Sequence, residues 1–418
     1  MSTQKHVVIV DAYSPTRRLA PVLHEAGYAV VRVQSTPGVP LVYQSSFDLS
    51  PYAANIVHDG DLEATIAAVA AFEPEAVIAG GEVGVEFADL LAERMGLAGN
   101  GTALSAARRD KYVQMETVRA AGVRATRQLL VTDAAQLADW HRDFGGRVVV
   151  KPLRSAAGDG VAFCSTPEES VAAYEAILGA ENVFSARNDG VVAQEYLAGG
   201  EYIVDIVSRE GRHHVTDVWK YEKISANGIL DLTTGLRILP RRGDAQDALV
   251  PYAFEVLDAL GVQYGASHLE IKLTPEGPCL VEAAARMAGL DIPFYSRECI
   301  GEAHLEWIVD AYVRPDRFDA RWKDDYRLNR HWVSAMAVST VDAELAGYPL
   351  LPVIEGLESF QDVRPVVSPG GRLRPTIDDM TCPLIVNFAH EVEEIAIRDF
   401  GTVRHLDGPA FYELAGES

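Results

Sequence analysis

Cysteine is scarce in this chain of 418 residues, and its few copies stand far apart. No two of the four form a Cys-x-x-Cys pair; they are Cys164, Cys279, Cys299 and Cys382. This spacing argues against a disulfide framework and against a zinc site. The sequence also lacks an apolar run of the ~18 residues that a membrane span needs, and its N-terminus shows no signal-peptide pattern. We therefore expect a cytoplasmic protein without a membrane partner.

Positively charged residues are also few relative to negatively charged ones. Lysine and arginine number 37 against 60 aspartates and glutamates, which gives a formal net charge of −23. Binding to a nucleic-acid backbone needs clustered lysine and arginine, so we expect no nucleic-acid partner. A nucleotide substrate is not excluded, because it needs only a few local cations and a metal ion. The length predicts two to four domains.

The N-terminal part of the chain predicts an open α/β unit. Residues 6–34 alternate strand, helix and strand, and Val7–Val10 forms the continuous apolar run of a strand buried on both faces. A second such strand, 76–79, leads into the glycine-rich segment Gly80–Gly84. Ligands bind at the carboxyl ends of strands in such folds, so this segment is either an anion site or a tight turn before a helix. It does not match the GxGxxG motif, which argues against an NAD site.

Residues 266–289 predict a β-hairpin, because two apolar-rich runs flank a cluster of turn-forming residues. If Leu273 pairs with Cys279, Glu270 lies directly opposite Glu282. Two carboxylates so placed repel each other unless a cation lies between them or one of them is protonated. Mg²⁺ or Mn²⁺ would fit, since both prefer oxygen ligands. The alternative is a solvated hairpin face with scattered charge.

The same register places further polar side chains beside this pair. His268 faces Ala284, and Arg286 follows two residues later on the same face. An arginine in this position could hold a phosphate or a developing negative charge.

A lysine and a loop of small residues predict a phosphate-binding element. The β-branched strand 147–152 carries Lys151 near its end, and residues 154–161 then read RSAAGDGV. Small residues let backbone N–H groups approach phosphates closely. Between two strands the loop would cover phosphates while Lys151 supplied a point charge; the alternative is a flexible hairpin tip. The loop lacks GxxxxGK[ST], which excludes a Walker P-loop. Lys111, near the start of a predicted helix, is a further isolated cation.

Residues 191–207 predict two strands separated by a short glycine break, Ala198–Gly200. The free backbone groups of such a connector could hydrogen-bond an adenine edge, and Glu201 could hold ribose hydroxyls. Without other support the pattern is only an interrupted strand. Further along we expect two strands, two helices and a β-rich C-terminal part, at 215–223, 228–236, 247–261, 304–312 and after Arg330.

Taken in order, these elements resemble the ATP-grasp superfamily, and within it the carboxylate–amine ligases similar to bacterial L-amino acid ligases. The motifs that carry the match are Lys111, VVVKP at 148–152, the loop 154–161, QEYLAGGE at 194–201, and Glu270, Glu282 and Arg286. They share the family's order and approximate spacing. The resemblance covers residues 6–315 well and the C-terminus loosely.

The resemblance implies an α/β (α+β) ATP-grasp fold in three parts. Residues 1–110 would form an N-terminal open α/β (pre-ATP-grasp) domain. Residues 111–318 would form the ATP-grasp domain, with a lid subdomain at about 125–193. Residues 319–418 would form a small β-rich C-terminal domain of α+β type.

The resemblance also implies how the nucleotide is held. The phosphates of ATP would contact Lys111 and Lys151, and the loop would close over them through Ser155, Ala156, Gly158 and Gly160. The backbone of Glu195 and Leu197, which flank Tyr196, would read the adenine. Glu201 would hold the ribose.

At the reacting end the resemblance implies a metal site and three catalytic residues. Glu270 and Glu282 would bind Mg²⁺, with Mn²⁺ as an alternative. The family often places an asparagine ligand two residues after the second glutamate, where this chain has Ala284; one metal ion would then be held more loosely or through water. The catalytic residues would be Lys151, Arg286 at the acyl-phosphate oxygens, and His268 at the γ-phosphate or the substrate carboxylate.

The implied activity is that of an ATP-dependent, ADP-forming ligase. It would join a small carboxylic acid, such as an L-amino acid, to an amine, such as an amino acid, through an acyl phosphate. The implied partners are these small molecules and a second copy in a homodimer. The alternatives are a biotin-carboxylase-like or purine-biosynthesis-type enzyme of the same fold, and a non-catalytic nucleotide-binding protein. A cationic amine could be held by Glu82, Asp291 or Glu298.

Overall fold

Four parallel strands in the order β3-β2-β1-β4 form the N-terminal part of the computed structural model, which describes residues 4–416. The strands are β1 (Lys5–Val10), β2 (Tyr28–Gln34), β3 (Ala54–Val57) and β4 (Ala76–Ala79). The helices and 3-10 turns of this part are η1 (Thr16–Arg18), α1 (Leu19–Glu25), α2 (Leu41–Gln44), α3 (Leu62–Ala70), η2 (Glu82–Gly84), α4 (Val85–Met95) and η3 (Ala106–Arg108). Residues Val7–Val10 are fully buried, as their continuous apolar run predicts.

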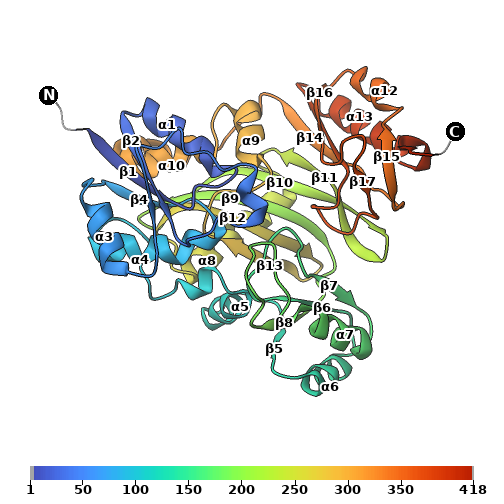
Figure 1. Ribbon diagram of the computed structural model, residues 1–418, viewed down its shortest axis with the longest axis horizontal. Coiled ribbons are helices and arrows are strands. Elements are labelled where there is room, and N and C mark those ends of the chain that lie inside the picture. The colour runs from blue at the N-terminus through green and yellow to red at the C-terminus, as the bar shows by residue number, and fades with distance from the viewer. Residues whose placement is uncertain (1–3, 417–418) are drawn as a thin grey trace.

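A small antiparallel sheet, β5-β8-β6-β7, projects from the rest of the molecule and is called the lid below (Figure 1). Helix α5 (Lys111–Ala120) precedes it in the chain. The lid consists of β5 (Gln128–Val131), α6 (Ala134–Phe144), β6 (Val148–Pro152), β7 (Ala162–Cys164), α7 (Pro167–Ile177) and β8 (Val191–Glu195). Because β6 and β7 pair directly, residues 153–161 form the loop between two strands that the sequence predicts. This loop is called the flap below.

An eight-stranded sheet, β13-β12-β9-β10-β11-β14-β18-β16, runs through the centre of the molecule. Its first five strands in chain order are β9 (Gly200–Arg209), β10 (Arg212–Ala226), β11 (Ile229–Leu239), β12 (Tyr264–Thr274) and β13 (Gly277–Ala284). The helices around it are α8 (Asp244–Ala259), α9 (Ile292–Ile300), α10 (His304–Val313) and α11 (Pro315–Arg321). The predicted helices at 247–261 and 304–312 are thereby confirmed.

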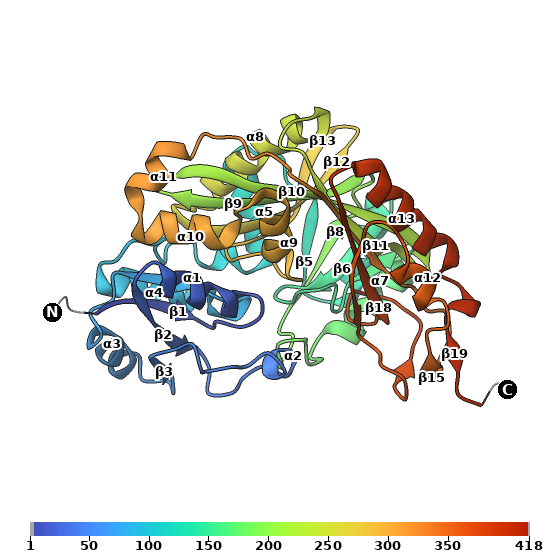
Figure 2. The same cartoon turned by 90° about the horizontal axis from the view of Figure 1, so that it is seen from above.

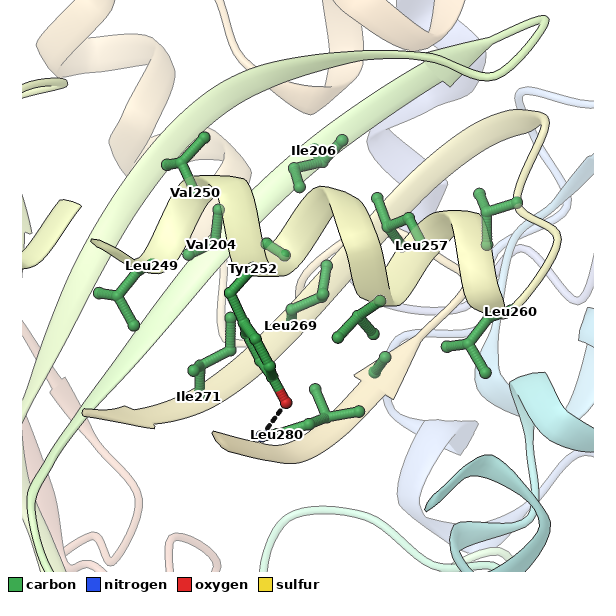
Figure 3. Packing of buried hydrophobic residues seen from close by; sticks show 14 of the residues in the cluster. Val204, Ile206, Leu249, Val250, Tyr252, Leu257, Leu260, Leu269, Ile271 and Leu280 are labelled. Atoms are coloured by element: carbon green, nitrogen blue, oxygen red, sulfur yellow. Dashed lines mark hydrogen bonds between the residues drawn. The ribbon is translucent and has the colours of Figure 1, made fainter. Parts of the chain in front are cut away.

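Helix α8 covers one face of β9, β12 and β13 (Figure 3). Its apolar side chains share one buried cluster with those of the strands, including Val204, Leu269 and Leu280. The hydroxyl of Tyr252 accepts a hydrogen bond of 2.8 Å from the Leu280 N–H and donates one of 2.6 Å to the Arg124 carbonyl. One face of these strands is therefore filled by the core, which leaves the opposite face for a ligand.

The C-terminal part extends this same sheet. Strands β14 (His331–Met336), β16 (Phe360–Pro365) and β18 (Leu384–His390) continue it beyond β11. The other elements are β15 (Ala343–Gly347), α12 (Leu351–Glu355), β17 (Arg372–Leu373), α13 (Glu393–Leu406), η4 (Pro409–Phe411) and β19 (Glu413–Leu414). The N-terminal sheet and these elements lie at opposite ends of the long axis (Figure 1, Figure 2). None of the helices in residues 4–416 has the length and apolarity to cross a membrane.

Candidate active site

A cavity of about 240 Å³ opens between the central sheet, the lid and a turn of the C-terminal part. Most of the residues singled out in the sequence line it, although they come from distant parts of the chain. They are Lys111, Lys151, Ser155, Ala156, Gly158, Glu195, Tyr196, Leu197, Glu201, His268, Glu270, Glu282 and Arg286. Gly160 is not among the lining residues: a side chain there would meet Pro152 at 2.8 Å, so Gly160 packs against the strand behind the flap.

The predicted pairing of Leu273 with Cys279 is wrong, because the hairpin turn is tighter than the sequence suggests. Leu273 pairs with Pro278, and a β-bulge then adds one residue to β13 before Glu282. The extra residue restores the predicted alignment, so Glu270 does face Glu282.

The bulge also decides which way Glu282 points. Side chains alternate between the two faces of a regular strand, which would send Glu282 to the core side with Leu280. With the bulge, Val281 and Glu282 both line the cavity, while Leu280 and Ala283 belong to the buried core. Bulges often re-aim side chains beside active sites. His268 pairs with Ala284, as predicted.

Glu270 and Glu282 each already have a hydrogen-bond partner. Burial would raise the pKa of Glu270, but its contacts with His268, Lys223 and Tyr221 lower that pKa to about 2. The Tyr221 hydroxyl donates to Glu270 at 2.9 Å. Glu282 accepts a hydrogen bond of 2.8 Å from the Lys111 ammonium group. Two carboxyl groups therefore face each other in one cavity.

Lys111 and Lys151 differ in their surroundings. Helix α5 begins at Lys111, where Asp110 caps the helix, and the ammonium group also donates to the Ser155 carbonyl at 2.9 Å. Lys151 on β6 is buried, and no carboxylate within the described residues lies within 4.0 Å of it. Burial and the nearby Lys111 charge lower the pKa of Lys151 to about 8. Lys151 is thus a desolvated cation that faces the cavity.

The far end of the cavity is formed by the connector after β8. The Glu195 and Tyr196 N–H groups donate to the Arg127 and Arg147 carbonyls at 2.9 and 3.0 Å. The Glu195 carboxylate accepts hydrogen bonds from the backbone N–H and Nε of Arg127, so it is not available to bind a ligand. Leu197 follows these residues and lines the cavity without belonging to a strand.

Glu201 lies in a cluster of charges that the sequence did not reveal in full. It forms ion pairs with Lys223 at 2.8 Å and with Lys272 at 3.6 Å, and Lys272 also binds Asp231. The sequence did contain a signal for Lys272. It stands two residues after Glu270 and four after His268, and strand alternation places all three side chains on one face, where the structure has them.

The flap is folded onto itself through short contacts. The Ser155 hydroxyl donates to the Asp159 carboxylate at 2.6 Å, and the same carboxylate accepts from the Val183 N–H at 2.9 Å. Gly158 and Gly160 have positive φ angles of 76° and 70°, which favour glycine. A side chain at Gly158 would meet Asp378 at 3.6 Å, so the flap lies against the C-terminal part.

Sequence reasoning missed this C-terminal contribution. Ile377, Asp378 and Asp379 line the cavity, although the sequence marks the two aspartates only as a turn. Burial raises the pKa of Asp379 to about 6; Lys223 opposes this rise and Glu270 adds to it. A turn nearly a hundred residues beyond the hairpin carries no local signal that it will reach the same cavity.

Arg286 lies at the cavity edge and contacts the N-terminal part of the chain. Its Nε donates to Glu82 at 2.8 Å, and Arg109 lies 3.6 Å from the same carboxylate. Glu82 is therefore held between two arginines and is not free to bind a cationic amine. Asp291 is paired with Arg18 and Arg364, and Glu298 is exposed on α9. None of these three acids is among the described residues that line the cavity. The glycines before Glu82 serve close packing, since a side chain at Gly81 would meet the Asp11 carbonyl at 2.7 Å.

Comparison with known proteins decides the family. A model of the ATP-grasp domain matches residues 145–293. Dapdiamide A synthase of Enterobacter agglomerans is 30% identical over 408 residues, which cover 96% of this chain and 93% of that protein. The chain belongs to the ATP-grasp carboxylate–amine ligases. The predicted fold class is confirmed: an L-amino acid ligase from Bacillus licheniformis covers the whole of both chains with a TM-score of 0.76 at 15% identity.

A second relative belongs to the same group of ligases. Alanine–anticapsin ligase of Bacillus subtilis is 28% identical over 239 residues, which cover 52% of this chain and 50% of that protein. The chain is accordingly an ATP-dependent, ADP-forming ligase that joins a carboxylate to an amine. The predicted activity class is confirmed, and the cavity with its facing glutamates is the candidate active site.

Proposed function

We propose that this ligase joins two amino acids, activating the carboxylate of one as an acyl phosphate. The observation that carries the proposal is the facing pair Glu270 and Glu282, set beside two lysines and Arg286 in one cavity. Binding of a nucleotide alone does not require two carboxylates beside an arginine. The names of the relatives support amino-acid substrates, because one joins alanine to anticapsin and another is an L-amino acid ligase.

The two glutamates fit a magnesium ion. Both are anionic oxygen donors on one cavity wall, and Mg²⁺ typically binds one or two carboxylates together with water and substrate phosphates. No group of three His, Cys, Asp or Glu side chains in residues 4–416 is arranged to hold a metal. Because they face each other in the cavity, we assign Glu270 and Glu282 as the protein ligands, with Mn²⁺ as an alternative ion. Bound there, the ion would neutralise phosphate charge.

The remaining cavity residues divide between the two ends of ATP. Lys151 and Lys111 would bind the phosphates, because both ammonium groups border the cavity. Since the Glu195 N–H is already used, Glu195 would read adenine through its carbonyl, and Leu197 through its N–H. Glu201 would hold the ribose hydroxyls, and Tyr196 would line the base site.

The proposed reaction has two steps. An oxygen of the substrate carboxylate attacks the γ-phosphorus of ATP, which forms the acyl phosphate and releases ADP. The amine then attacks the acyl carbon, the amide bond forms, and phosphate leaves. Arg286 would hold the acyl-phosphate oxygens and the tetrahedral intermediate by charge-assisted hydrogen bonds. His268 would bind the γ-phosphate or the substrate carboxylate.

The flap would keep water away from the acyl phosphate. Its small residues Ser155, Ala156 and Gly158 line the cavity, so their backbone can approach the phosphates closely. Gly160 would act at a distance from the ligand, as the residue that lets the flap fold against Pro152. Exclusion of water is needed because an acyl phosphate hydrolyses readily.

The test is a matrix of amino acids and other small carboxylic acids with Mg-ATP. We expect ADP, phosphate and an amide product, the last seen by mass spectrometry, only where a carboxylate and an amine are both present. Glu282→Gln should lower the rate about a hundredfold, since one charge-stabilising group is lost. The matched control is Glu276→Gln at the exposed turn of the same hairpin, which should leave the rate unchanged.

Two results would contradict the proposal. Phosphate release supported by bicarbonate without an amine would indicate a carboxylase. Tight ATP binding without turnover for any pair of substrates would indicate a nucleotide-binding protein.

Three further predictions stay proposals. We propose the division into residues 1–110, 111–318 and 319–418, although the central sheet crosses the last boundary. We also propose a homodimer, which sedimentation would test, and a cytoplasmic location.

A further inference from the structure

Four residues form one row across the central sheet, directly behind the proposed reacting end. Ala284 pairs with His268, His268 with Asp205, and Asp205 with Asp217, on β13, β12, β9 and β10. Both aspartates have zero exposure to solvent. Two carboxyl groups thus lie opposite each other in the middle of a sheet, where like charges are unfavourable.

Each of the two aspartates has one oxygen with a known partner. Oδ1 of Asp205 accepts a hydrogen bond of 2.7 Å from Nδ1 of His268. Oδ1 of Asp217 accepts one of 2.8 Å from the Trp219 indole, whose N–H also lies 3.2 Å from the Ser296 hydroxyl. Within the described chain, the Oδ2 atoms of both aspartates are buried without a hydrogen-bond partner. These are the two atoms left to interact with each other.

No lysine or arginine of the described residues lies within 4.0 Å of either carboxyl group, and His268 alone forms such an ion pair. His304 faces the same region; it is fully buried and its Nε2 has no partner in the described part of the chain. Burial and the Asp205 charge raise the pKa of Asp217 well above its usual value. Burial acts on Asp205 in the same direction, but His268 and His304 hold its pKa below the usual value. Asp205 also has the imidazole of His268 as its partner, whereas Asp217 has only the neutral Trp219 indole, so the contacts place the proton on Asp217.

We propose that Asp217 donates a shared proton to Asp205, and that this pair is a positioning device that fixes His268 at the reacting end of the cavity. Asp217 presents a neutral hydroxyl to Oδ2 of Asp205. Asp205 stays anionic and holds the Nδ1 proton of His268. Nε2 of His268 then points to the cavity side, where it lies 3.7 Å from Glu270.

The shared proton makes this arrangement tolerable in a buried sheet. Two unprotonated carboxylates would leave an uncompensated buried charge, which is strongly unfavourable in proteins. One proton leaves a single negative charge on the pair, and Nδ1 of His268 lies within hydrogen-bond distance of it. Since neither aspartate lines the cavity, both would act only through His268. The inference rests on the role proposed above for His268, but the shared proton itself can be tested without any substrate.

The first experiment is infrared spectroscopy of the substrate-free protein at neutral pH. Wild type minus Asp217→Asn should show a carboxylic-acid C=O band that wild type minus Asp258→Asn lacks. Asp258 is a matched control, because it is a largely exposed aspartate on α8. Absence of the carboxylic-acid band would overturn the shared proton, whatever the enzyme catalyses.

The second experiment compares kinetics and histidine NMR. Asp217→Asn keeps a donor toward Asp205 and should keep kcat within about threefold. Asp217→Leu leaves Oδ2 of Asp205 without a partner and should lower kcat about tenfold or more. Asp205→Asn should also lower kcat about tenfold or more, with an unchanged KM for ATP. It should in addition shift the ¹⁵N signals of His268. Equal kcat values for wild type, Asp205→Asn and Asp217→Leu would overturn the positioning role. If Asp205→Asn or Asp217→Leu fails to fold, the infrared band still decides the pairing.

Discussion

At the scale of one residue, Lys151 places a buried positive charge where an anion can bind. Its ammonium group is buried beside a second lysine, which makes the charged form costly until phosphates arrive. Lys111 is instead engaged by Glu282 and the flap. A metal ion at Glu282 would free Lys111 for the phosphates. Within the described residues, Lys151 thus forms no ion pair, whereas Lys111 is paired with Glu282.

The lowered pKa of Lys151 predicts a pH dependence of nucleotide binding. In the ATP-free protein Lys151 is an ammonium group below pH 8 and a neutral amine above it. Because the amine does not attract phosphate, the Kd for Mg-ATP should rise about tenfold between pH 7 and pH 9. Lys151→Arg stays charged throughout this range and should bind with a nearly constant Kd. Titration calorimetry measures both; a constant Kd in wild type would contradict the role of Lys151.

At the scale of an element, the flap depends on glycines that allow positive φ angles and close packing. Gly160 needs a positive φ and also has Pro152 where a Cβ would stand. Gly122, at the end of α5, needs a positive φ of 81° but has open space around it. Substitutions at these two glycines therefore distinguish the cost of backbone strain from the cost of a steric clash.

Gly160→Ala should impair the flap more than backbone strain alone explains. Strain should cost both Gly160→Ala and Gly122→Ala about 1 kcal/mol of unfolding free energy. The clash with Pro152 should add to this cost and raise the KM for ATP severalfold in Gly160→Ala only. Urea unfolding and steady-state kinetics measure the two effects. An unchanged KM in Gly160→Ala would show that the flap tolerates a side chain there.

The hairpin shows how far a strand pattern can predict a site. The alternation of His268, Glu270 and Lys272 is visible in the sequence and sets the cavity face of β12. The facing of Glu270 and Glu282 was predicted correctly from an incorrect turn, because a bulge compensates for the tighter loop. The position of such a bulge could not be predicted, because no particular residue type in the sequence indicates where the extra residue is inserted.

At the scale of the whole molecule, the cavity joins segments that the sequence cannot place together. Arg286 and Glu82 are 204 residues apart, and the C-terminal turn at 377–379 reaches the same cavity. The order of motifs predicted the fold, since order along the chain is a sequence property. The partners of a buried charge depend on tertiary structure, so the ion pairs of Glu82 and Glu201 and the burial of Asp379 came only from the structure.

The lid also touches the N-terminal part of the chain (Figure 2). Tyr43 on α2 stacks on Tyr13 at 4.6 Å and lies 6.2 Å from Phe184, in the segment between α7 and β8. Phe184 is buried, although it belongs to a connecting segment. This contact joins the lid to the N-terminal part of the chain.

Loss of this contact should uncouple ATP hydrolysis from amide formation. Phe184→Ala should let water reach the acyl phosphate more often, so the ratio of phosphate released to amide formed should rise severalfold above one. Leu178→Ala, an exposed residue of the same lid, should keep the ratio near one. A slower reaction with an unchanged ratio in Phe184→Ala would mean that the contact does not exclude water.

The most direct test of the central claim follows one oxygen atom. A substrate carboxylate labelled with ¹⁸O is turned over with Mg-ATP and an amine, and the released phosphate is analysed by mass spectrometry. Attack of the carboxylate on the γ-phosphorus predicts one ¹⁸O atom in each phosphate formed with an amide, and ADP as the nucleotide product. Unlabelled phosphate, or AMP in place of ADP, would contradict activation through an acyl phosphate.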